Sequence, residues 1–167
     1  MSAPAILVTL AVPWSQLYGD SALLQILVVF GHIAALVFAG GLAVTLDRAT
    51  LRAARGSSEM RWRQLEELRA AHRLVLVGLT LSLVTGVLLF GADVETYFVA
   101  WIFWLKLGLI VALLANGFRM TRVESRIGET PNAADDAGWR ALRLSASVSI
   151  FLWFAIAFAG VALVNAA

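Results

Sequence analysis

Four long apolar stretches dominate the chain. They run from about Ala22 to Leu46, Leu74 to Phe90, Phe98 to Met120 and Leu144 to Val164. A helix needs about 20 apolar residues to cross the hydrocarbon core of a bilayer, and each stretch is near that length. An open sheet would leave unpaired backbone groups in lipid, and the Leu, Ala and Val content favours helices over barrel strands. The pattern predicts an all-α integral membrane protein, a four-transmembrane-helix bundle that forms one membrane domain over residues 1–167.

The polar segments predict further elements. Residues 2–20 contain a short apolar run that Pro13 interrupts, with no basic residue before it as a signal peptide would have. We expect this segment to lie on the outer membrane surface as a short helix. Glu59 to Ala71 is rich in helix formers and lacks Gly and Pro, which predicts a cytoplasmic helix leading into the second span. Arg126 to Gly138 contains glycines and a proline, which is typical of a loop.

Composition supports the membrane class. Hydrophobic residues make up 60% of the 167 residues and charged residues 14%, against about 25% charged in a typical soluble domain. A soluble domain of this size could not bury so much apolar surface, and disordered chains are poor in apolar residues. Disorder is therefore excluded, and an ordinary soluble enzyme is not expected.

The basic residues predict the orientation of the helices. Of the 13 Lys and Arg residues, all except Lys106 lie in or beside the connections that follow the first and third stretches. Because loops rich in Lys and Arg stay in the cytoplasm, we expect both connections to be cytoplasmic and both termini to lie outside. In a bacterium this means an inner-membrane protein with periplasmic termini. The positive charge is explained by these loops, so nucleic acid is not an expected partner.

Several kinds of site are excluded. The chain has no cysteine, which excludes disulfides, thiolate metal sites and cysteine nucleophiles. No phosphate-binding loop, dinucleotide fingerprint or nucleophile elbow is present. Small residues recur every four positions in the spans, which favours close packing of one bundle. These residues are Gly31, Ala35, Ala39 and Ala43, then Gly78, Ser82 and Gly86, then Gly108, Ala112 and Asn116, and finally Ala155 and Ala159.

Two ionisable residues inside the spans are the main candidates for chemistry. His32 lies about 15 Å into the first span and Lys106 about 12 Å into the third, at 1.5 Å per residue. Both spans run from outside to inside, so we expect the two side chains at similar depth. Ionisable groups at membrane depth are costly and are functional candidates by default.

A histidine at this depth suits haem iron. We expect His32 to be an axial ligand of haem b, with Lys106 as a second ligand or a partner of a propionate. Ser82 and Thr85 would supply hydrogen bonds, and Trp104 and Trp153, with Phe103, would wall the macrocycle. Two alternatives stay open. His32 would be a neutral histidine bonded to a neighbouring helix, and Lys106 would extend towards the outer surface.

Other ionisable residues have simpler interpretations. His72 begins the second span, at a depth that makes a haem bridging it to His32 geometrically poor, and is expected to be interfacial. Asp47, at the inner end of the first span, is expected to pair with Arg48, Arg52 or Arg73.

Three motifs resemble a known group of membrane proteins. The first span runs His32-Ile-Ala-Ala-Leu-Val-Phe-Ala-Gly-Gly41-Leu, the second opens His72-Arg73-Leu74, and the third contains Trp104-Leu-Lys106-Leu. These motifs resemble the small four-helix proteins related to HemJ-type protoporphyrinogen oxidases. CopD-like copper-resistance proteins share a similar layout. The likeness is strongest to an uncharacterised family whose second helix ends Thr-Gly-x-Leu-Leu-Phe, here Thr85 to Phe90.

The resemblance implies haem b bound through His32, with Lys106 at the site. HemJ-type proteins carry a further Tyr-His where this chain has Asn116-Gly117-Phe118, which argues against protoporphyrinogen oxidation. We therefore expect a haem-b membrane protein for electron transfer or redox chemistry, as an oxidoreductase component. Its expected partners are the lipid bilayer, a quinone or partner oxidoreductase, and a second copy of the chain. The alternatives are a copper or ion transporter and a non-catalytic membrane subunit.

Overall fold

The computed structural model describes residues 2–129 and 136–166, and these form six helices with no strand among them. The helices are α1 (Ala5–Asp20), α2 (Ala22–Ala53), α3 (Ser58–Ala92), α4 (Val94–Val99), α5 (Trp101–Glu129) and α6 (Asp136–Ala166). The prediction of an all-α chain is confirmed.

Four of the helices are long and apolar enough to cross a membrane: α2, α3, α5 and α6. Each contains one of the four apolar stretches of the sequence. α2 has 32 residues and α3 has 35, so each spans about 50 Å at 1.5 Å per residue, which exceeds a hydrocarbon core of about 30 Å. Large apolar side chains such as Phe30, Phe158 and Val164 face outward, as lipid contact requires.

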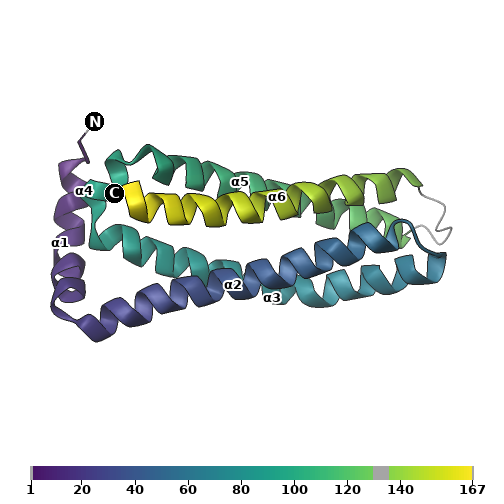
Figure 1. The fold of residues 1–167 in the computed structure, drawn as a ribbon, viewed down its shortest axis with the longest axis horizontal. Coiled ribbons are helices and arrows are strands. Elements are labelled where there is room, and N and C mark those ends of the chain that lie inside the picture. The colour runs from purple at the N-terminus through teal and green to yellow at the C-terminus, as the bar shows by residue number, and fades with distance from the viewer. Residues whose placement is uncertain (1, 130–135, 167) are drawn as a thin grey trace.

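The long helices form two antiparallel hairpins that lie side by side (Figure 1). α2 packs along α3, α5 packs along α6, and α2 joins the hairpins by packing on α6. Within the described residues, α3 and α5 do not approach each other closely along their backbones. Close backbone packing therefore joins three of the four neighbouring helix pairs. The fourth pair, α3 and α5, is in contact through side chains.

Glycines and alanines bring α2 close to its neighbours. A Cβ atom on Gly78 of α3 would lie 2.8 Å from the Cβ of Ala39, so only glycine fits there. Gly40 meets the ring of Trp153 on α6 in the same way. The predicted packing stripe of the third span is wrong at Gly108 and Ala112, which are exposed. The face of α5 that packs on α6 carries Leu109 and Leu113 instead, together with Asn116 of the predicted stripe.

α1 lies across one end of the bundle, where it contacts α2, α3 and α4 (Figure 1). None of its residues is buried. The indole of Trp14 donates a hydrogen bond of 2.8 Å to the carbonyl of Leu88 on α3, which fixes α1 to the bundle. The short helix predicted within residues 2–20 is present, and it continues through Pro13. A proline removes one backbone donor, and the ladder continues on both sides of it.

The opposite end holds most of the arginines, and we call it the arginine-rich end. α3 begins there, where the hydroxyl of Ser57 accepts from the backbone N–H of Met60, and continues unbroken to Ala92. This confirms the predicted helix that leads into the second span. The predicted loop over 126–138 is too long, because α5 continues to Glu129 and α6 begins at Asp136. Residues 130–135 of that prediction lie outside the described residues.

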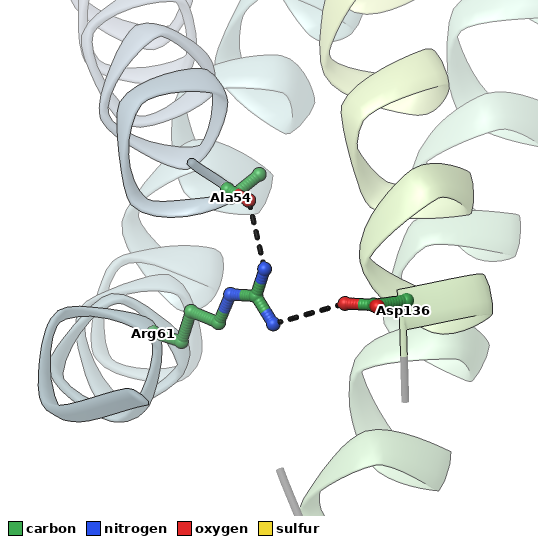
Figure 2. Close-up of polar contacts among 3 residues, drawn as sticks. All are labelled: Ala54, Arg61 and Asp136. Carbon is green, nitrogen blue, oxygen red and sulfur yellow. Dashed lines mark hydrogen bonds and ion pairs between the residues drawn. The ribbon is translucent and has the colours of Figure 1, made fainter. Parts of the chain in front are cut away.

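One arginine ties the two hairpins together at this end. Figure 2 shows Arg61 of α3 between the last turn of α2 and the start of α6. Its guanidinium donates to the carbonyl of Ala54 at 3.0 Å and pairs with Asp136 at 3.3 Å. It also lies 5.4 Å from the centre of the Trp139 ring. Trp139 is buried in an apolar cluster with Ala53, Leu65 and Ile127, so packing continues past the apolar spans.

Candidate functional site

His32 lies on the face of α2 that packs against α3, where it is half-buried. Its Nδ1 atom is 3.0 Å from the backbone carbonyl of Ser82 and 3.0 Å from the hydroxyl of Thr85. The Thr85 hydroxyl donates its own proton to the carbonyl of Leu81 at 2.7 Å. Both neighbours of Nδ1 therefore act as acceptors, and Nδ1 must carry the proton. In the neutral ring this leaves the Nε2 lone pair available.

Small residues make room for the imidazole. A Cβ atom on Gly86 would lie 3.3 Å from the Cε1 atom of His32, so the ring lies directly against the α3 backbone. One residue earlier on α2, Gly31 faces the methyl group of Thr85. The ring orientation is therefore set by two hydrogen-bond acceptors and by close packing.

Lys106 approaches from the other hairpin. It is half-buried on α5, and its ammonium group lies 3.6 Å from the position of a Cβ on Gly160 of α6. In the described part of the chain, no hydrogen bond joins this ammonium group to His32.

The other residues named from the sequence lie differently. Ser82 offers His32 its backbone carbonyl, and Thr85 offers its hydroxyl. Trp104 is 50% exposed and donates to the carbonyl of Phe98. Trp153 is buried against Gly40, two turns along α2 from His32. The structure therefore brings neither tryptophan to the imidazole. Phe103 is half-buried and stacks on Phe90 of α3 at 5.0 Å between ring centres.

A cavity of about 250 Å³ lies between the four long helices, on the side of Trp153 nearer the arginine-rich end. Most of its lining is apolar. Its polar residues are Asp47, His72, Asn116, Thr121, Glu124 and Ser149. Sequence reasoning missed this cavity, although Asn116 and Glu124 lie eight residues apart on one helix face. Polar residues at helical spacing near a span end were the available signal.

Asp47 is the most unusual group in this cavity. It is 3% exposed, and its Oδ2 atom has no hydrogen-bond partner in the described part of the chain. Ser149 of α6 lies beside the carboxylate. The predicted pairing of Asp47 with an arginine is wrong, since the ion pairs of the described residues are Arg61–Asp136, Arg63–Glu59 and Arg69–Glu124. The side chain turns into the bundle, whereas the neighbouring arginine, Arg48, faces outward.

Among residues 2–129 and 136–166, no three His, Asp or Glu side chains are grouped closely enough to hold a metal ion. A porphyrin supplies four ligands of its own, so haem iron needs only axial protein ligands. His32, with one protonated nitrogen fixed and the other available, has the form that such a ligand requires.

No family model matches this chain. Searches of curated proteins and of solved structures found no match either.

Proposed function

We propose that this protein binds haem b in the membrane through His32 and passes electrons. The observation that carries the proposal is the Nδ1–H of His32 bonded to the Ser82 carbonyl. Histidines that bind metals almost always donate their second ring nitrogen to a carbonyl or carboxylate, which fixes the tautomer and the ring orientation. This arrangement leaves Nε2 for iron.

The surroundings of His32 support the same proposal. Lys106, on the other hairpin, would supply either the second ligand or the partner of a propionate, and the stacked Phe90 and Phe103 would offer a flat apolar wall. Haem b, when bound, supplies one-electron transfer. The residues of the chain orient the imidazole, place a positive charge nearby and exclude water. The resemblance to HemJ-type proteins agrees with a haem ligand at His32.

The charge distribution supports a location and an orientation. We propose an inner-membrane protein of a bacterium with the arginine-rich end in the cytoplasm and both termini in the periplasm, because basic residues favour the cytoplasmic side. A quinone or a partner oxidoreductase would exchange electrons with the haem.

The two histidines provide a matched test. The protein is purified in mild detergent from haem-replete cells, and visible spectra are recorded in the oxidised and reduced states. The wild type and His72→Ala are expected to show equal haem b per chain, and His32→Ala to lose nearly all of it. A colourless wild type, or a His32→Ala variant that keeps its haem, overturns the proposal. Equal thermal unfolding of the two variants separates lost binding from lost folding.

A further inference from the structure

Four arginines line one groove at the arginine-rich end. Arg52 belongs to the last turn of α2 and Arg55 to the turn that follows it, and Arg140 and Arg143 belong to the start of α6. Arg140 and Arg143 are three positions apart on α6, so they lie on the same face of that helix. The groove has a volume of about 640 Å³ and is also lined by Leu51, Leu144 and Ser147.

None of these arginines is neutralised by the protein. Arg61, Arg63 and Arg69 form ion pairs at this end, whereas the guanidinium groups of the four groove arginines have no ion pair or hydrogen bond in the described part of the chain. Four like charges in one groove repel each other. An anion bound between them would remove this repulsion and would occupy guanidinium groups that favour phosphate oxygens.

The position of the groove indicates where the anion comes from. Leu144 starts the apolar stretch of α6 and is 57% exposed, while Leu51 lies one turn beyond the apolar stretch of α2. The groove is therefore at the level where the hydrocarbon region ends and lipid phosphates begin. Apolar side chains below the arginines would contact acyl chains, which a soluble phosphate lacks.

We propose that this groove is a binding site for the phosphate headgroup of an anionic phospholipid. The arginines of α2 and α6 hold the phosphate together, and the hydroxyl of Ser147 donates a further bond. Since α2 and α6 belong to different hairpins, the bound lipid links the hairpins beside the Arg61 contact. The site is distinct from His32 and does not depend on haem.

Native mass spectrometry of the full chain in detergent tests this site, with phosphatidylglycerol and phosphatidylcholine as probes. Arg140→Gln with Arg143→Gln is expected to weaken phosphatidylglycerol binding at least about tenfold, because charge-assisted bonds are lost. Arg52→Gln with Arg55→Gln is expected to have the same effect from the other helix. Phosphatidylcholine is expected to bind weakly to every form.

The matched control removes the same charge at the same end. Arg48 and Arg73 are exposed and do not line the groove, so Arg48→Gln with Arg73→Gln is expected to change binding by less than about twofold. Equal losses of phosphatidylglycerol binding in the control and groove variants would show that net charge alone causes the effect, and would contradict the proposed site. If glycerol phosphate without acyl chains binds as tightly as phosphatidylglycerol, the lipid assignment is wrong.

Discussion

Single side chains in this bundle often bond to the backbone of a neighbouring helix. His32 reaches the carbonyl of Ser82, Asn116 reaches that of Ser145 at 2.9 Å, and Gln64 reaches that of Leu46 at 3.2 Å. The sequence could indicate His32 because an isolated histidine in an apolar span is conspicuous. It could not indicate the Ser82 carbonyl, because every residue has a carbonyl and only the rotation of α3 selects one. The exposure of Trp104 depends on the rotation of α5 in the same way.

Two buried carboxylates are expected to have opposite effects on stability when each is replaced by its amide. Asp47 has an unpartnered oxygen, whereas Glu124 pairs with Arg69 at 3.5 Å. A buried charge without a partner destabilises the fold, and breaking a buried pair does too. Asp47→Asn is therefore expected to raise the free energy of unfolding by about 1 kcal/mol. Glu124→Gln is expected to lower it by a similar or smaller amount, since Arg69 is largely exposed.

Thermal unfolding in detergent, followed by tryptophan fluorescence, measures both variants. The prediction is contradicted if Asp47→Asn lowers the midpoint of thermal unfolding as Glu124→Gln does. A stabilising Asp47→Asn would show that the carboxylate costs stability and that its presence needs a functional reason.

At the scale of helices, the contacts between neighbours depend on a few small residues. From the stripes of small residues the sequence predicted close packing of the bundle, and Ala39 and Gly78 of these stripes meet between α2 and α3. It failed for α5, where Gly108 faces outward. Periodicity shows that a helix has a small-residue face, but many membrane helices have one, and the pattern does not show which neighbour covers it. Packing against the other helices determines which face of α5 is buried.

Adjacent glycines on α2 give a matched test of the interface between the hairpins. A Cβ atom on Gly40 would lie 2.9 Å from the Trp153 ring, whereas a Cβ atom on Gly41 would have no atom within 4 Å. Both substitutions to alanine favour the helix equally. Gly40→Ala is therefore expected to be less stable than Gly41→Ala by about 1–3 kcal/mol. Equal unfolding free energies in the same detergent would show that α2 and α6 are not packed through Trp153.

At the scale of the whole molecule, one end is basic and the other is capped by a helix. The four apolar helices were predictable because length and hydropathy alone specify them. The pairing of α2 with α6, and the separation of α3 from α5, were not, because antiparallel neighbours joined by short loops fit several arrangements. Arg61 shows the reason, since its contacts with Ala54 and Asp136 join segments far apart in the sequence.

The absence of cysteine makes the orientation directly measurable. Ser2→Cys places one thiol near α1, and Ser58→Cys places one at the start of α3; both positions are exposed. In intact bacteria expressing each variant, a membrane-impermeant maleimide is expected to label Ser2→Cys. Ser58→Cys should be labelled only after lysis. The reverse pattern would place the arginine-rich end outside and contradict the proposed orientation.

The central claim is that the His32 imidazole ligates haem iron. Because the chain has 2 histidines, His72→Ala leaves His32 as the sole source of imidazole. The direct measurement is pulsed electron paramagnetic resonance of oxidised His72→Ala protein grown with isotopically labelled histidine. We predict a strong hyperfine coupling between the iron and the labelled nitrogen. A haem signal without that coupling, or no haem at all, would contradict the account.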